Sequence, residues 1–182
     1  DSMSGTFMDL NVPPTLVAFA VAVGKADKVV SQEFKQSGSQ VVLIKGLRDE
    51  AEIPDFEVLG RNYRAVHALI QTGKVLAAHT VRMGGLAAAL SKMSFGNGIG
   101  LVCSDSIAVE NLFSPDYGSI VLEVEDNVDL GEAFAGLEYQ RLGVTQAAPV
   151  LVVNGAEIEL EAAQKAWQRP LEKIFPTQTE KL

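Results

Sequence analysis

The chain has 182 residues, of which 47% are hydrophobic and 21% charged, and its formal net charge at pH 7 is -8. This composition fits one large globular domain, or a domain with an attached arm. Lys and Arg do not gather into a stripe, so nucleic acid is not an expected partner. The longest apolar run, residues 16–23, is too short to span a bilayer, so no membrane partner is expected.

The first elements alternate between polar and apolar stretches. Residues 1–14 are polar and small, end in two prolines, and predict an extended arm. The apolar residues 16–23 predict a buried strand, and residues 31–34 one helical turn. Residues 40–44 predict a second strand, and the acidic, proline-containing residues 47–56 a loop.

A helix, a strand and another helix are predicted next. Asn62 can cap a helix that runs to about Thr72, with Gly73 as its end. Residues 75–81 predict a strand and residues 84–95 a helix. Further strands are predicted at residues 99–103, 119–124 and 137–145, with short helices at 108–113 and 130–135.

A hairpin closes the pattern. Residues 150–153 (Val-Leu-Val-Val) and 157–160 (Glu-Ile-Glu-Leu) flank Asn154 and Gly155, a pair that tolerates the positive φ angles of a tight hairpin turn. A last helix starts near Leu160 and is expected to bend or break at Pro170. Strands that alternate with helices and end in a hairpin predict an α/β (α+β) fold, a layered domain with a mixed β-sheet flanked by helices. The spacing of a dinucleotide fingerprint and that of a P-loop are both absent from the sequence.

The most informative stretch is residues 79–86, His-Thr-Val-Arg-Met-Gly-Gly-Leu, between a predicted strand and a predicted helix. We call it the 79–86 turn. Glycines let the backbone approach a ligand, and the free N–H groups of a new helix point at negative charge. The turn therefore predicts a phosphate or carboxylate site. The alternative is that the two glycines serve only tight packing.

Several segments together resemble one family. They are residues 1–4 (Asp-Ser-Met-Ser), 14–21 (Pro-Thr-Leu-Val-Ala-Phe-Ala-Val), 27–30 (Asp-Lys-Val-Val), the 79–86 turn and 90–96 (Leu-Ser-Lys-Met-Ser-Phe-Gly). This pattern resembles the C-terminal domain of the aminoimidazole-ribonucleotide (AIR) synthase-related superfamily, and more closely that domain in the phosphoribosylformylglycinamidine synthase family. The resemblance implies that residues 1–14 are an arm from the preceding domain and that residues 15–182 form the AIR-synthase-related C-terminal domain.

The resemblance also implies a reaction. Formylglycinamide ribonucleotide, ATP and ammonia from glutamine give the amidine, ADP and phosphate in purine biosynthesis. ATP and Mg²⁺ would serve the parent enzyme, and neither is expected to bind this fragment tightly. The implied partners are a preceding AIR-synthase-like domain, a glutaminase domain and a small-molecule substrate; a homo-oligomer stays open. A chain that begins without Met looks like a fragment, expected to be inactive alone, and its single cysteine fits the cytoplasm.

The sequence departs from the family at an important place. The family's turn usually has the pattern His-Asp-x-Ser-Asp-Gly-Gly-Leu, whereas Thr80, Arg82 and Met83 replace the two carboxylates and the serine here. Thr80 and Met83 have no charge to offer Mg²⁺, so no metal ligand is predicted and the catalytic residues stay unknown. The predicted nucleotide- and phosphate-binding residues are His79, Thr80, Arg82, Gly84, Gly85, Asp1, Ser2 and Ser4.

Competing interpretations stay open. The domain could be a scaffold with a degenerate site and no ligand, or belong to a selenophosphate or thiamine-phosphate enzyme of the same superfamily. Arg82 could pair with a carboxylate instead of a phosphate, and His79 could be a structural hydrogen-bonding residue. His67 is expected to be half-buried and structural, Cys103 a buried strand residue, and Tyr139 and Trp167 core or domain-interface residues.

Overall fold

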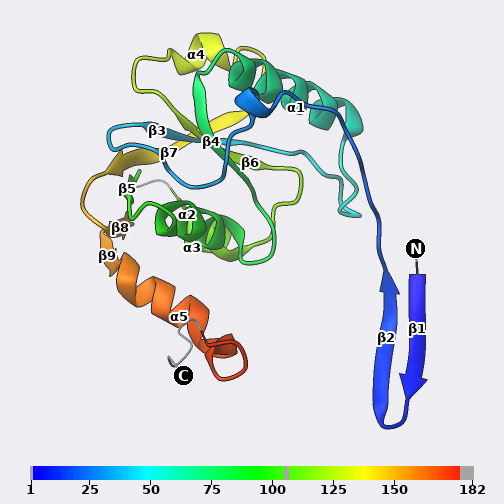
Figure 1. The fold of residues 1–182 in the computed structure, drawn as a ribbon. Helices are drawn as coiled ribbons and strands as arrows, with labels where there is room; N and C mark the ends of the chain where they lie inside the picture. The colour runs from blue at the N-terminus through cyan, green and yellow to red at the C-terminus, as the bar shows by residue number, and fades with distance from the viewer. Residues whose placement is uncertain (1, 105–106, 177–182) are drawn as a thin grey trace.

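The computed structural model describes residues 2–104 and 107–176, and its centre is a mixed β-sheet (Figure 1). The sheet strands are β3 (Gln40–Ile44), β4 (Val75–Thr80), β5 (Gly100–Cys103), β6 (Ile120–Val124), β7 (Tyr139–Gln146), β8 (Val150–Val153) and β9 (Ala156–Glu159). Their order is β4-β6-β3-β7-β5-β8-β9. β5 and β8 are parallel and the other neighbouring strands are antiparallel, which confirms the predicted mixed sheet.

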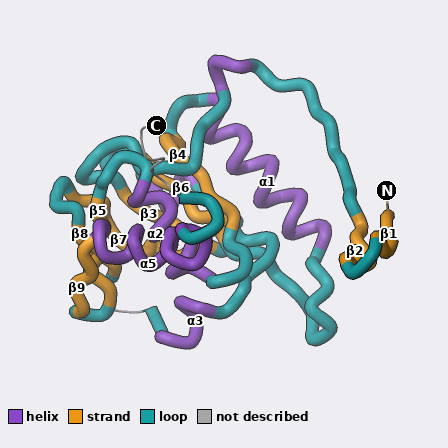
Figure 2. The backbone as a smooth tube through the Cα atoms, turned by 60° about the horizontal axis from the view of Figure 1, so that its bottom comes forward, coloured by secondary structure: helices purple, strands orange, loops and turns teal. Residues whose placement is uncertain are grey.

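Helices cover both faces of this sheet. One face carries α1 (Phe56–Gln71) and α4 (Leu130–Ala133), and the other carries α2 (Gly85–Phe95), α3 (Val109–Phe113) and α5 (Leu160–Glu172) (Figures 1 and 2). The predicted layered α/β architecture is therefore confirmed.

The core lies in two layers because side chains alternate along each strand. In β3, Val41 and Leu43 face a cluster that includes Leu90 and Met93 of α2. The intervening Val42 and Ile44 face the opposite cluster, which includes Val66 of α1. A strand this apolar on both faces belongs in the middle of a sheet, where β3 lies.

The start of α1 differs from the prediction. Its N-cap is Asp55, whose carboxylate accepts hydrogen bonds from the N–H groups of Glu57 and Val58 at 3.0 Å. Asn62 is buried within the helix, and its Nδ2 donates to the Lys45 carbonyl at 2.8 Å. The Asn62 amide therefore hydrogen-bonds a backbone carbonyl of the neighbouring loop and does not cap the helix. Helix α1 begins six residues before the predicted cap.

Two predictions before β3 are wrong. Residues 17–25 are irregular and mostly exposed, with Phe19 85% exposed, because no sheet strand lies beside this apolar run. Residues 31–34 form no helical turn; instead the buried Phe34 donates its N–H to the Met93 carbonyl at 2.8 Å. The only helical turn in this stretch is a short 3₁₀ segment, η1 (Ala26–Lys28).

The N-terminal arm is a hairpin of β1 (Ser2–Phe7) and β2 (Leu10–Leu16), which stands away from the sheet (Figures 1 and 2). Phe7 pairs with Leu10, and Gly5 with Val12, so Phe7, Leu10 and Val12 share one face of the hairpin. All three side chains are exposed. The predicted extended arm is thus paired with itself, and it presents an apolar face.

The C-terminal part follows the prediction closely. Asn154 and Gly155 have φ angles of 50° and 80°, as a tight hairpin turn between β8 and β9 requires. Helix α5 begins at Leu160, as predicted. It continues past Pro170 to Glu172 and is not broken at the proline.

Candidate functional site

The 79–86 turn joins β4 to α2, as the sequence predicts. β4 ends at Thr80, and the buried Val81 donates its N–H to the Ser119 carbonyl at 3.0 Å. The N-cap of α2 is Gly84 with φ of 88°, followed by Gly85 with φ of 63°. Positive φ angles favour glycine, so the two glycines allow the chain to turn from strand to helix within a few residues.

Both glycines are also needed for packing. A Cβ atom at Gly85 would lie 2.5 Å from the Leu112 carbonyl oxygen and 2.7 Å from that of Ser114. A Cβ atom at Gly84 would lie 2.8 Å from the Cβ of Ala88. The N–H of Gly85 donates to the Arg82 carbonyl at 2.9 Å, so it is not available to a ligand. The alternative that the glycines serve tight packing is therefore supported for Gly85.

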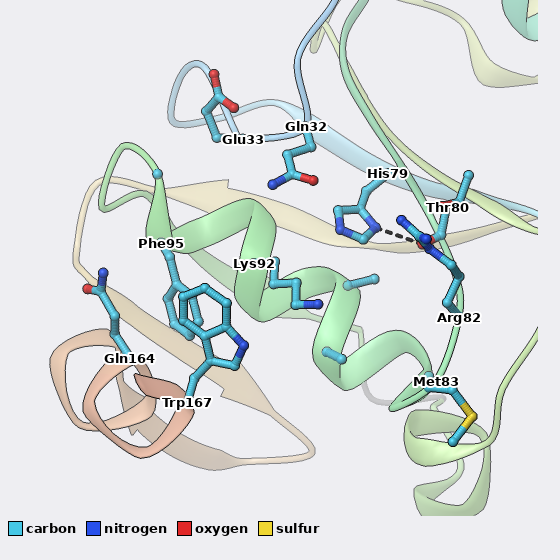
Figure 3. Close-up of a pocket in the computed structure, with 14 residues that line it drawn as sticks. Gln32, Glu33, His79, Thr80, Arg82, Met83, Lys92, Phe95, Gln164 and Trp167 are labelled. Carbon is cyan, nitrogen blue, oxygen red and sulfur yellow. Dashed lines mark hydrogen bonds between the residues drawn. The ribbon is translucent and has the colours of Figure 1, made fainter. Parts of the chain in front are cut away.

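A pocket of about 490 Å³ lies over this turn (Figure 3). Four of the predicted site residues line it: His79, Thr80, Arg82 and Gly85. Gly84, the remaining predicted site residue of the turn, lines an adjoining pocket of about 310 Å³. The volume of about 490 Å³ lies in the range of small-molecule sites, and residues of the 79–86 turn line one end of this pocket.

The described N-terminal residues of the predicted site are not among those that line the pocket. Ser4 lies in β1 of the hairpin that stands away from the sheet (Figure 1). Ser2 lies in the same strand, and Asp1 lies outside the described residues. The role predicted for these three residues stays a prediction.

Sequence reasoning did not assign several other pocket residues to the site, among them Lys92, Trp167, Gln164, Gln32 and Glu33. Lys92 had a usable signal, because it follows Gly85 by two helical turns and so lies on the same face of α2. Trp167 comes from α5 near the other end of the chain, and no local pattern links it to the turn.

The pocket carries unpaired positive charge. Among the described residues, neither Arg82 nor Lys92 forms a salt bridge. Glu33 is the one carboxylate among the residues that line the pocket, and it is held by Lys35 at 2.6 Å and by Ser31 at 2.6 Å. These hydrogen bonds, above all the one from Lys35, lower the pKa of Glu33 to about 2. Because Lys35 neutralises the charge of Glu33, the two positive charges of Arg82 and Lys92 in the pocket are not neutralised by it.

His79 is half-buried at the end of β4, and its Nδ1 lies 2.7 Å from the Thr80 carbonyl oxygen (Figure 3). A carbonyl only accepts, so Nδ1 carries the proton and donates. Burial lowers the pKa of His79, the Thr80 hydrogen bond opposes this, and the nearby cations Lys92 and Arg82 lower it further. The imidazole is therefore neutral at pH 7, and its Nε2 can accept a hydrogen bond from a ligand.

The donor set does not fit magnesium. Mg²⁺ prefers carboxylate oxygens, and the only carboxylate that lines the pocket, Glu33, is already held by Lys35. Met83 is largely exposed and offers only a thioether. Nowhere in residues 2–104 and 107–176 do three or more His, Cys, Asp or Glu side chains gather as a metal site would require.

The remaining candidate residues have structural or surface positions. His67 is exposed on α1 with Nε2 3.4 Å from Nε2 of Gln71, so the predicted half-burial is wrong. Cys103 is buried in β5 as predicted, and burial raises the pKa of its thiol to about 11. Tyr139 packs against Phe134 beside the α1 cluster, as a core residue does. In the part of the chain that the structure describes, no helix has the length and apolar character needed to cross a membrane.

Comparison with known proteins finds relatives named PurL, although no family model matches the chain. The subunit PurL of phosphoribosylformylglycinamidine synthase from Thermus thermophilus is 31% identical over 190 residues, which cover 90% of this chain and 26% of PurL. PurL from Thermoplasma acidophilum is 35% identical over 114 residues, 56% of this chain and 15% of PurL. The chain thus spans about a quarter of the length of the first relative.

Solved structures agree on the fold. PurL from Thermotoga maritima complexed with ATP has a TM-score of 0.62 and 17% identity, covering 75% of this chain and 27% of PurL. The hydrogenase maturation protein HypE in complex with ATP has a TM-score of 0.56 and 13% identity, covering 75% of this chain and 54% of HypE. At these identities the structures show the shared fold alone. With the sequence matches, they confirm the predicted resemblance to the AIR-synthase-related superfamily.

Proposed function

We propose that this chain, an AIR-synthase-like domain similar to phosphoribosylformylglycinamidine synthase, is one part of a larger ligase of that kind. The parent enzyme would convert formylglycinamide ribonucleotide, ATP and ammonia from glutamine into the amidine, ADP and phosphate. One observation carries the proposal: the match to Thermus thermophilus PurL extends over 90% of this chain at 31% identity. The structures of PurL with ATP support ATP as the nucleotide of the parent enzyme.

Within that enzyme, the pocket over the 79–86 turn would bind a phosphate group without a metal. Arg82 and Lys92 supply two unpaired cations, and a guanidinium can hold two phosphate oxygens at once. Leu86 and Ala87 follow Gly85 in the first turn of α2, where backbone N–H groups lack intrahelical acceptors. The neutral His79 would accept a hydrogen bond from a ligand hydroxyl group at Nε2. Residues 1–14, with Asp1, Ser2 and Ser4, would belong to the preceding domain and reach the ligand from there.

A binding titration tests the anion site. We expect inorganic pyrophosphate to bind the full chain in the presence of EDTA, measured by calorimetry. Arg82→Ala should weaken binding by about 1.5–3 kcal/mol, the range for a hydrogen bond to a charged group. The matched control is Arg61→Ala, which removes an exposed guanidinium from α1 on the opposite face of the sheet. Binding that requires Mg²⁺, or equal affinities for the chain and Arg82→Ala, would contradict the proposal.

The isolated chain should have no ligase or glutaminase activity. A glutaminase of this kind uses a cysteine nucleophile, and Cys103, the only cysteine, is buried with a raised pKa. A glutaminase partner and a preceding AIR-synthase-like domain would therefore complete the enzyme. Amidine formation by the purified chain, measured with glutamine, ATP and formylglycinamide ribonucleotide, would overturn this expectation.

A second candidate function is a scaffold domain that packs against a sibling domain and binds no ligand. The packing of Gly85 against α3 favours it, because that packing explains the Gly-Gly pair without a ligand. The same titration separates the two functions. A chain that binds neither pyrophosphate nor nucleotide at millimolar concentrations would favour the scaffold.

A further inference from the structure

We propose that α5 supplies a base-binding subsite to the pocket, so that its ligand is a nucleotide whose heteroaromatic base stacks on Trp167. This inference rests on the proposed anion site and extends it to the other end of the same pocket. It concerns Trp167 and Gln164, two pocket residues that lie outside the 79–86 turn.

Trp167 is held in place without being buried. Its ring centroid lies 5.8 Å from that of Phe95 of α2, with the two ring planes tilted by 35°. The side chain is nevertheless 57% exposed, and Leu160 is the buried residue of α5. The core therefore does not need the indole, which leaves an aromatic surface supported by Phe95 and open to a ligand.

The pocket has two chemically different ends (Figure 3). Trp167 and Gln164 enter from α5 at one end, and Arg82 and His79 lie at the end of β4 at the other (Figure 3). Lys92 of α2 lies between them (Figure 3). An aromatic end joined to a cationic end suits a molecule with a planar ring at one end and phosphate at the other.

Gln164 adds hydrogen bonding to the aromatic end. It precedes Trp167 by three residues on α5, so the two side chains lie on neighbouring positions of one helix face. A side-chain amide both donates and accepts, which matches the edge of a nucleobase. A pocket of about 490 Å³ falls within the range of volumes that hold small ligands. The geometry thus points to a nucleotide and not to a phosphorylated sugar that lacks an aromatic base.

Tryptophan fluorescence tests this directly, because Trp167 is the only tryptophan in the chain. With EDTA present, ADP should quench the emission in a saturable manner. Pyrophosphate should compete with ADP without quenching, since it lacks a ring. Calorimetry should show that Trp167→Ala weakens ADP binding by about tenfold, as base–aromatic stacking predicts, and pyrophosphate binding by less than about twofold. Trp167→Phe should retain most of the ADP affinity.

Tyr117→Ala is the matched control, since Tyr117 is an exposed aromatic residue that does not line the pocket. An unchanged ratio of ADP to pyrophosphate affinity in Trp167→Ala overturns the base subsite, even if Arg82→Ala confirms the anion site. ADP quenching with an unchanged half-saturating concentration in Arg82→Ala supports the base subsite and contradicts the anion site. Ribose 5-phosphate that binds as tightly as ADP also overturns the inference. If neither ADP nor pyrophosphate binds, both proposals are wrong.

Discussion

Gly85 illustrates how one residue can be required for structure inside a candidate ligand site. Its φ of 63° and the carbonyl oxygens of Leu112 and Ser114 leave no room for a Cβ atom. We expect Gly85→Ala to lower the free energy of unfolding by about 2–4 kcal/mol, measured by urea denaturation. Gly73→Ala is the matched control: its φ is 78°, but no atom lies within 4 Å of the added Cβ, so it should cost about 1 kcal/mol. Equal losses would contradict the packing argument.

His79 should make stability depend on pH. Its pKa is lowered from the model-compound value of 6.5, mainly by burial, so the unfolded chain binds the proton more readily than the folded one. The stability that this contributes is present above pH 6.5 and is lost as pH falls through the lower pKa of the folded state. The difference in unfolding free energy between the chain and His79→Gln should therefore shrink between about pH 7.5 and about pH 5. A difference that is constant across this range would contradict the expectation.

At the scale of elements, Glu123 of β6 fixes the segment before β3. Its buried carboxylate accepts the N–H of Lys35 at 2.7 Å and that of Gln36 at 3.1 Å. Burial raises the pKa of Glu123, and these two hydrogen bonds act against the rise. The same segment carries Gln32 and Glu33 to the pocket, so a buried acid in the sheet positions one wall of the candidate site.

Removing this carboxylate should destabilise the domain. Glu123→Ala would leave two backbone N–H groups without their acceptor and should lower the unfolding free energy by about 2–4 kcal/mol in thermal or urea denaturation. Glu157→Ala, in the exposed edge strand β9, should change it by less than about 0.5 kcal/mol. A loss at Glu123 no larger than that of the control would show that the segment is held by other contacts.

At the scale of the whole molecule, the N-terminal hairpin adds apolar surface and no core. Neither buried cluster of the described residues contains a residue from the first 25. Phe7, Leu10 and Val12 expose one face, and an isolated two-stranded hairpin is only marginally stable in water. The hairpin therefore suits a partner surface, which the proposed preceding domain would supply.

A chain shortened to residues 26–182 should retain a cooperative thermal transition within about 2 °C of the full chain, because core burial is unchanged. Its tendency to self-associate, measured by analytical ultracentrifugation, should be lower than that of the full chain. Loss of the transition would mean that the hairpin contributes to the fold. Equal self-association of the shortened and the full chain would mean that the self-associating surface lies elsewhere, for example at the exposed Leu171, Ile174 and Phe175 near the C-terminus.

The sequence by itself determined the elements whose signals are local. Runs of apolar residues, a tight turn at Asn154 and Gly155, and a strand followed by Gly84 and Gly85 each depend on neighbours within a few residues. They sufficed for the mixed sheet with helices on both faces and for the position of the 79–86 turn. The family resemblance, which depends on the order of such segments, was also available from the sequence.

The tertiary structure alone decided which residues are buried and which elements pack against one another. Residues 16–23 have the apolar pattern of a core strand, yet they pair with no strand of the central sheet. Asn62 has the residue type of a helix cap, yet its amide donates to the Lys45 carbonyl. The pocket is the clearest case, because Arg82 and Trp167 are 85 positions apart and come together only when α5 returns to pack beside α2. Local periodicity indicates which side of an element is apolar, but which other element covers that side is decided by contacts distant in the chain.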